Sequence, residues 1–79
     1  MAYIGIGYSG SDPSFLRGEV DKRLSWLRGE RRPHFFGDGF VVLYDSNTAR
    51  EFVRKCADDA GQGNITLYPM DNPLPQEPV

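Results

Sequence analysis

The segment at residues 2–8 constrains the fold most, because its side chains alternate in character with a period of two. One side of the predicted strand is apolar and the other consists mainly of glycine: Ile4, Ile6 and Tyr8 against Tyr3, Gly5 and Gly7. A strand with one bulky apolar side needs another layer of structure against that side. The chain is therefore expected to form a sheet with helices on one face.

Two helices are predicted from apolar residues at helical spacing. The first is expected over residues 13–28, because Asp12 and Pro13 suit a helix start and Gly29 a helix stop. The second begins within residues 45–48, where Thr48 and Glu51 have capping-box spacing, and ends at Gly61. Its apolar stripe consists of Ala49, Phe52, Val53, Cys56, Ala57 and Ala60.

Three further strands are predicted at residues 34–36, 40–44 and 64–68, with a turn at the glycines of 37–39. The resulting order, βαββαβ, is that of an α+β ferredoxin-like (split βαβ) sandwich, with a four-stranded antiparallel sheet and two helices on one face. If residues 37–39 form only a bulge, the order becomes βαβαβ. A single domain over 1–68 and a proline-rich, flexible tail over 69–79 are expected.

The alternation also predicts which strand residues meet the helices and which face outward. The inward set is Ile4, Ile6, Val41, Leu43, Ile65 and Leu67. The outward set is Tyr3, Phe40, Val42, Tyr44, Thr66 and Tyr68. Four aromatic side chains on an open sheet face indicate a binding surface, a dimer interface or a face covered by the tail. Tyr3, Phe40, Tyr44 and Tyr68 are the predicted partner-binding residues.

A rival surface is predicted near the end of the first helix. Residues 17–32 hold six of the nine Lys and Arg residues, and Arg28, Arg31 and Arg32 are clustered there. Trp26 lies off the apolar stripe of this helix and is a candidate interface anchor beside the arginines. The alternatives are a solvated basic face and a tryptophan that packs on the edge of the core.

Two short segments resemble RNA-recognition-motif domains, which share the βαββαβ order. Residues 2–5 (AYIG) are similar to the first-strand signature of that family, and residues 37–43 (GDGFVVL) to the third-strand signature. The resemblance implies single-stranded RNA stacked on Tyr3 and Phe40. It departs from the family pattern at Phe36, where a basic residue belongs, and at Asp38, where an aromatic belongs.

No pattern in the chain predicts catalysis, a metal site or a cofactor. The G-x-G-x-x-G match at residues 5–10 lies partly within a predicted strand, where close packing explains the glycines better than a nucleotide does. His34 is the only histidine, and Cys56, on the apolar stripe of the second helix, is expected to be a packed thiol. We therefore expect a protein that is not an enzyme and that carries no metal or cofactor.

A single cysteine excludes an intramolecular disulfide, which indicates a reducing compartment, and no leader or membrane-spanning segment is expected. The prediction is a cytoplasmic, non-enzymatic protein that acts by binding another protein. In its small size and its lack of catalytic motifs it resembles phage proteins that inhibit bacterial defence complexes, such as anti-CRISPR proteins. This resemblance would place it in the host cytoplasm. The alternatives are a single-stranded nucleic-acid binder and a structural homodimer.

Overall fold

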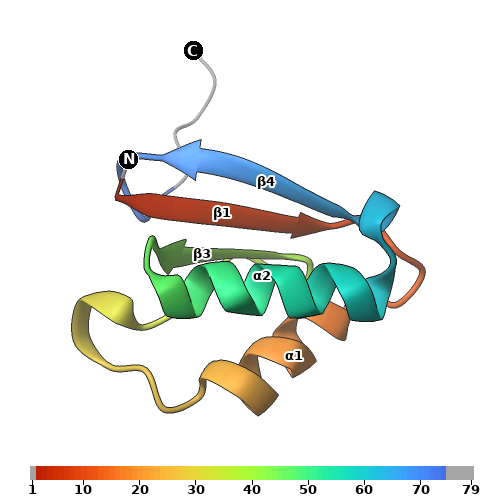
Figure 1. The fold of residues 1–79 in the computed structure, drawn as a ribbon, viewed down its shortest axis with the longest axis horizontal. Helices are drawn as coiled ribbons and strands as arrows, with labels where there is room; N and C mark the ends of the chain where they lie inside the picture. Colours follow the sequence, from red (N-terminus) through yellow and green to blue (C-terminus); the bar gives the residue numbers. More distant parts are fainter. Residues whose placement is uncertain (1, 75–79) are drawn as a thin grey trace.

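Four strands and two α-helices form two layers in the computed structural model, which describes residues 2–74 (Figure 1). In chain order the elements are β1 (Tyr3–Tyr8), α1 (Phe15–Leu24), η1 (Gly29–Arg31), β2 (His34–Phe35), β3 (Phe40–Tyr44), α2 (Asn47–Ala60), η2 (Gln62–Asn64) and β4 (Ile65–Met70). The antiparallel sheet has the order β2-β3-β1-β4. This confirms the predicted α+β ferredoxin-like sandwich, and pairing of β2 with β3 as a hairpin excludes the βαβαβ order.

The core lies between the sheet and the two helices, which Figure 1 shows on the same side of the strands. Its members come from one face of β1 and β3, from one stripe of each helix and from Leu27, which follows α1: Ile6, Val41, Leu43, Leu16, Val20, Leu24, Leu27, Ala49, Phe52 and Cys56. Ile4 and Ile65 pack against this cluster. The predicted inward face is thus confirmed for five of its six residues.

Leu67 and Val42 differ from their predicted environments, although both lie on the predicted faces. Leu67 pairs with Ile6 and so is on the helix side, but it is 50% exposed because it lies on the edge strand β4, beyond the buried cluster. Val42 is on the open face, between Gly5 and His34 in register, and is fully buried by its neighbours.

α1 is shorter at both ends than the sequence predicted. Near each end, side chains form hydrogen bonds with backbone groups that would bond within the helix if it were longer. At the start, the Asp12 carboxylate accepts hydrogen bonds from the backbone N–H and hydroxyl of Ser14, which holds residues 13–14 in a turn. At the end, the Trp26 indole donates to the Arg23 carbonyl, and the Arg28 guanidinium donates to the carbonyls of Ser25 and Leu27.

α2 begins one residue before Thr48, and the residue that caps it is Ser46. The Ser46 hydroxyl oxygen accepts the Ala49 backbone N–H at 3.2 Å, and the extended backbone of Ser46 is typical of an N-cap. Ser46 lies within the predicted start at residues 45–48, whereas the cap suggested by the spacing of Thr48 and Glu51 is not used, because Thr48 already lies inside the helix. The predicted end is confirmed at Gly61, whose φ of 86° requires a residue without a side chain.

β4 continues through Pro69 to Met70, two residues beyond the predicted strand and into the segment predicted as tail. Ser9 donates its backbone N–H to the Asn64 carbonyl. In an antiparallel pair every second residue forms such hydrogen bonds, so in β4 the even-numbered residues are hydrogen-bonded to β1. Pro69 pairs with Ile4 at a position whose backbone nitrogen points to the free edge. A proline there removes no sheet hydrogen bond. Residues 75–79 of the predicted tail lie outside the described residues.

The assignment of the α2 cap predicts a difference between two similar substitutions. Ser46→Ala removes the acceptor for the Ala49 N–H and should lower the free energy of unfolding by about 1 kcal/mol. Thr48→Ala is the matched control and should change it by less than about half that amount. Urea unfolding followed by circular dichroism measures both. A larger loss for Thr48→Ala than for Ser46→Ala would contradict the assignment.

Candidate functional site

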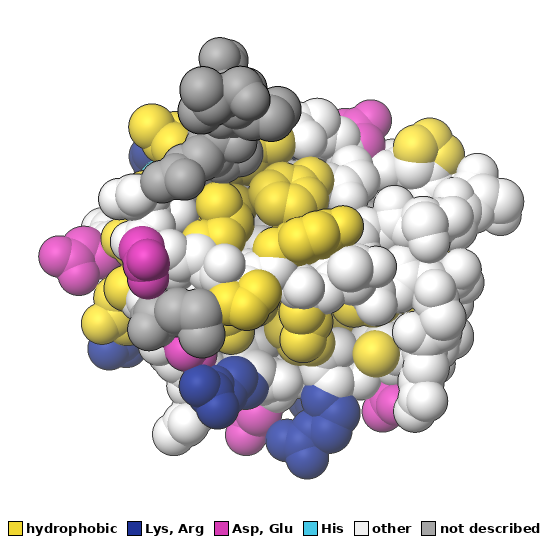
Figure 2. All heavy atoms as spheres, turned by 90° about the horizontal axis from the view of Figure 1, so that it is seen from above, with side chains coloured by type: hydrophobic (Ala, Val, Ile, Leu, Met, Phe, Trp, Pro, Cys, Tyr) yellow, Lys and Arg dark blue, Asp and Glu magenta, His cyan; other side chains and the backbone are white. Residues whose placement is uncertain are grey.

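The face of the sheet opposite the helices, here called the open face, carries two groups of aromatic side chains. The cross-strand register places eleven residues on it: Tyr3, Gly5, Gly7, His34, Phe36, Phe40, Val42, Tyr44, Thr66, Tyr68 and Met70. Figure 2 looks onto the molecule from the side of β1 and β4 and shows hydrophobic side chains gathered in the middle, with both basic and acidic side chains around them. The open face is therefore an apolar surface with a charged margin.

Three of the aromatic rings form a row across the sheet. The ring centroids of Phe36 and Phe40 are 6.0 Å apart, and those of Phe40 and Tyr68 are 5.6 Å apart. A second pair, Tyr3 and Tyr44, meets edge to face at 5.8 Å near the other end of β1 and β3. These separations are within the range of favourable aromatic contacts, so the rings support one another and form an ordered surface.

Glycines beneath this row allow the rings to lie close to the sheet. A Cβ atom at Gly5 would come within 2.9 Å of both Phe40 Cζ and Met70 Sδ. A Cβ atom at Gly7 would come within 3.2 Å of Tyr68 Cε2. The two glycines that interrupt the apolar pattern of β1 therefore have a packing role, and they make room for the aromatic surface.

All four aromatics predicted as partner-binding residues lie together on the open face, and one predicted arginine joins them. The Arg31 guanidinium lies 5.8 Å from the centroid of the Tyr44 ring, in cation–π geometry. Sequence reasoning missed Phe36, His34 and Met70. The alternation of residues 34–36 opposite 40–42 would have indicated the first two, once the hairpin register was known.

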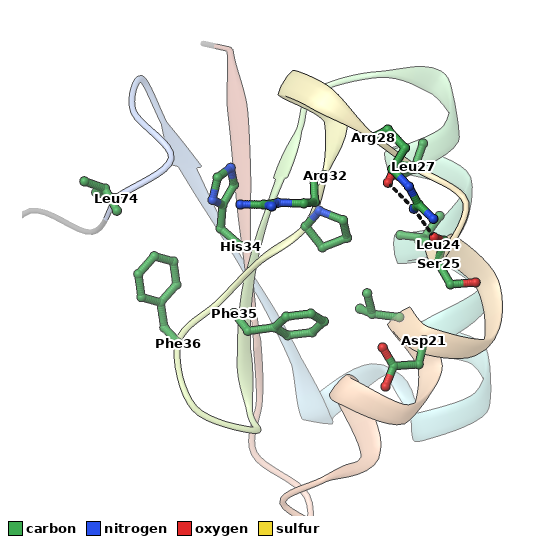
Figure 3. Close-up of a pocket in the computed structure, with 12 residues that line it drawn as sticks. Asp21, Leu24, Ser25, Leu27, Arg28, Arg32, His34, Phe35, Phe36 and Leu74 are labelled. Carbon is green, nitrogen blue, oxygen red and sulfur yellow. Dashed lines mark hydrogen bonds between the residues drawn. The ribbon is translucent and has the colours of Figure 1, made fainter.

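Arg28 and Arg32 line a groove beside the free edge of β2, here called the β2 groove (Figure 3). Its volume is about 590 Å³, and it lies between the last part of α1, residues 32–36 and Leu74. Figure 3 shows Phe35 directed toward Leu24 and Asp21 of α1, whereas His34 and Phe36 lie on the Leu74 side. Because Phe36 and His34 also belong to the open face, the groove and the open face are continuous at β2.

Trp26 is separated from these surfaces. Its side chain is 63% exposed and lines a hollow between α1 and α2 together with Thr48, Glu51 and Lys55. Its indole nitrogen is satisfied by the Arg23 carbonyl, as described above. Trp26 therefore lies apart from Arg31 and Arg32, which are on the sheet side. Arg28 lines the β2 groove, which shares Leu24 with the hollow beside Trp26.

Two ion-pair clusters have structural rather than binding geometry. Arg23 of α1 bonds Glu19 at 2.7 Å and also Asp59 of α2, so it ties the two helices together. Arg50 donates two hydrogen bonds to the Asp45 carboxylate, and these bonds lower the pKa of that carboxyl. Both arginines are engaged by carboxylates, which leaves less positive charge for a ligand than the sequence suggests.

The residues considered for catalysis are not assembled into a reactive group in residues 2–74. Cys56 is buried in the core, and burial is the main cause that raises the pKa of its thiol to about 11. His34 lies on β2, across the sheet from Cys56. No group of three His, Cys, Asp or Glu residues suited to a metal ion occurs in the described part of the chain. No helix within residues 2–74 is long and apolar enough to cross a bilayer.

Comparison of the chain with protein-family models, with curated proteins and with solved structures finds no significant match. The class of the protein is therefore defined by its fold, a small ferredoxin-like α+β sandwich, and by the aromatic open face.

Packing over Gly5 predicts that a single methyl group disturbs the open face. Gly5→Ala should lower the free energy of unfolding by about 1 kcal/mol or more, because the methyl group displaces the Phe40 ring and Met70. Gly18→Ala is the control, since Gly18 lies within α1 with nothing within 4 Å of an added Cβ, and it should raise stability by about 1 kcal/mol. Urea unfolding measures both, and shifts of the Phe40 ring resonances should accompany only Gly5→Ala. Equal effects would contradict the packing.

The Cys56 environment predicts slow thiol chemistry in the folded protein. The neutral thiol is favoured because burial raises the pKa to about 11, so at pH 8 the thiolate is about a hundredfold scarcer than for an ordinary cysteine of pKa 9.0. Labelling by a disulfide reagent should therefore be at least about a hundredfold slower in buffer than in 8 M urea. Its rate in buffer should rise with pH up to about 11. Equal rates would show that Cys56 is exposed.

Proposed function

We propose that this chain is a small non-enzymatic binding protein whose open face docks onto another protein. The observation that carries the proposal is the aromatic row Phe36, Phe40 and Tyr68, which is ordered by mutual contacts and by the glycines beneath it. Tyr68 is 46% exposed at its end. Aromatic residues on a rigid element provide large contact area at little entropic cost, which is why they are frequent anchors of protein interfaces.

The charges at the margin of the open face favour a protein over a nucleic acid. Arg31 and Arg32 supply positive charge at the β2 side. A carboxylate is also at this margin, because Asp38 is exposed in the loop between Phe36 and Phe40. A nucleic-acid surface needs a continuous positive field along the phosphate backbone. Mixed charge around an apolar centre is instead typical of a protein interface.

The aromatic row is also the observation that favours the second candidate, a single-stranded nucleic-acid binder resembling RNA-recognition-motif domains. Tyr3 and Phe40, the stacking positions implied by that resemblance, both lie on the open face. Pairing of two copies through the same face is the third candidate. All three use one surface, so they are distinguished by the ligand that this surface retains.

A reducing, cytoplasmic location is part of the proposal and is supported by the single buried cysteine. The narrower prediction is a phage-encoded inhibitor of a bacterial defence complex, such as an anti-CRISPR protein. It depends only on the small size and the lack of catalytic motifs, and it stays a prediction.

Substitution of Tyr68 tests the proposed docking face. Tyr68→Ala removes the most exposed ring of the row and should weaken the complex with a protein partner by about thirtyfold, as expected for an interface anchor. Trp26→Ala is the matched control on the helix side and should leave affinity within about threefold. Partners captured from a bacterial lysate are purified, and their dissociation constants for the three proteins are measured by calorimetry.

Each other outcome identifies a different function. Loss of binding with Trp26→Ala but not with Tyr68→Ala would overturn the proposal in favour of the helix side. Tight, salt-sensitive binding of a uridine oligonucleotide that is lost with Tyr68→Ala would show a nucleic-acid binder. A concentration-dependent dimer in analytical ultracentrifugation that Tyr68→Ala dissociates would show self-association.

A further inference from the structure

The β2 groove differs in its chemistry from the open face. Its floor is apolar, because Leu24 and Leu27 of the α1 end and Phe35 of β2 line it. Its volume of about 590 Å³ lies within the range of pockets that enclose ligands, about 300–1,000 Å³. The groove has room for two or three side chains of an extended peptide.

The charges around the groove are mainly positive. Arg28 and Arg32 line it, and the Arg17 guanidinium lies 4.3 Å from the centroid of the Phe35 ring on its α1 side. The carboxylate on its wall is that of Asp21, on α1. Arginine side chains outnumber carboxylates at this site, although the protein as a whole has a net charge of −2.

Arg32 is the arginine available to a ligand. Arg28 is occupied by the carbonyls of Ser25 and Leu27, and Arg17 by the Phe35 ring. The Arg32 side chain is exposed and forms no hydrogen bond or ion pair with residues 2–74, and Figure 3 shows it extended beside His34 at the mouth of the groove. A planar guanidinium with no partner among the described residues suits a carboxylate.

The free edge of β2 adds backbone groups to this site. Phe36 donates its N–H to the Phe40 carbonyl, so by antiparallel alternation the N–H and carbonyl of Phe35 point away from β3, toward the groove. Peptides that bind beside a sheet edge use such groups, while pockets for alternate side chains supply specificity.

We propose that the β2 groove binds an extended, acidic peptide segment of a partner protein. One carboxylate of the segment pairs with Arg32, a neighbouring apolar side chain occupies the floor of Leu24, Leu27 and Phe35, and its backbone bonds Phe35. This site can be tested apart from the proposed role of the open face, because Tyr68 and Phe40 do not line the groove, although Phe36 and His34 belong to both surfaces.

A fluorescein-labelled hexapeptide of alternating valine and glutamate serves as the probe, with fluorescence anisotropy as the measurement. The matched peptide of valine and lysine should bind at least about fivefold more weakly. Binding of the glutamate peptide should weaken as NaCl rises from about 0.05 to 0.5 M, because exposed charges are then screened. Equal binding of the two peptides would overturn the proposal.

Charge reversal at the groove locates the site. Arg32→Glu should weaken binding of the glutamate peptide by at least about fivefold, and the variant should no longer prefer this peptide over the lysine peptide. Arg54→Glu, an exposed reversal on α2, changes net charge equally and should have no more than a twofold effect. Ser25→Trp should block the groove without altering charge, since Ser25 is exposed on its wall.

Three outcomes would overturn the proposal. Equal effects of Arg32→Glu and Arg54→Glu would show attraction to overall charge only. Retained binding in Ser25→Trp would place the peptide elsewhere. Displacement of the peptide by a thymidine decanucleotide at lower concentration than by unlabelled peptide would assign the arginines to a nucleic acid. Tyr68→Ala should leave peptide binding unchanged, so failure here and failure of the open-face proposal are distinguishable.

Discussion

The alternation of β1 is the constraint on which the rest of the structure depends. β1 pairs with β3 on one side and β4 on the other, so its register determines which residues of three strands meet the helices. In the observed register, Ile6 lies in the core and Gly5 lies under the open-face rings. A slip of one residue would place glycines against the helices and leave the isoleucines in water. Both faces of the sheet therefore oppose such a slip.

The same alternation explains how a chain of 79 residues forms a packed surface on both sides of one sheet. The helix side is filled by aliphatic side chains, Phe52 and Cys56, with Tyr8, Phe15 and Phe35 packed against them. The open side has no second layer of secondary structure in residues 2–74, and large rings that lie over small residues cover it instead. Val42 is fully buried there without any helix above it. An aromatic surface that contributes to burial in the free protein is already ordered before a partner arrives, which lowers the entropic cost of binding.

Sequence patterns predicted the features of the fold that depend on periodicity alone. They did not predict the features that depend on hydrogen bonds between single side chains and the backbone. The order of elements, the faces of the strands and the end of α2 at Gly61 follow from periodicity and from one positive φ angle. The ends of α1 do not, because Asp12, Trp26 and Arg28 bond to backbone groups, and those bonds depend on side-chain geometry. Ser46 and Thr48 are both candidate caps by residue type, and the path of the backbone selects Ser46.

The candidate sites were predictable to the extent that they follow from strand register. Tyr3, Phe40, Tyr44 and Tyr68 share a face by alternation alone. Phe36 and His34 require the hairpin register, and the β2 groove requires the packing of α1 against the edge of the sheet, which no local pattern encodes. The arginine cluster is divided in the structure: Arg31 contacts the open face, Arg32 stands at the groove and Arg28 bonds the carbonyls that follow α1. Phe36 and His34 belong to both the groove and the open face, and Arg32 lines the groove beside them, so a partner proposed for the aromatic row would lie next to Arg32. A partner with a carboxylate beside an apolar contact region would therefore pair its carboxylate with Arg32 and pack its apolar region on the aromatic row. One partner could in this way occupy both proposed sites.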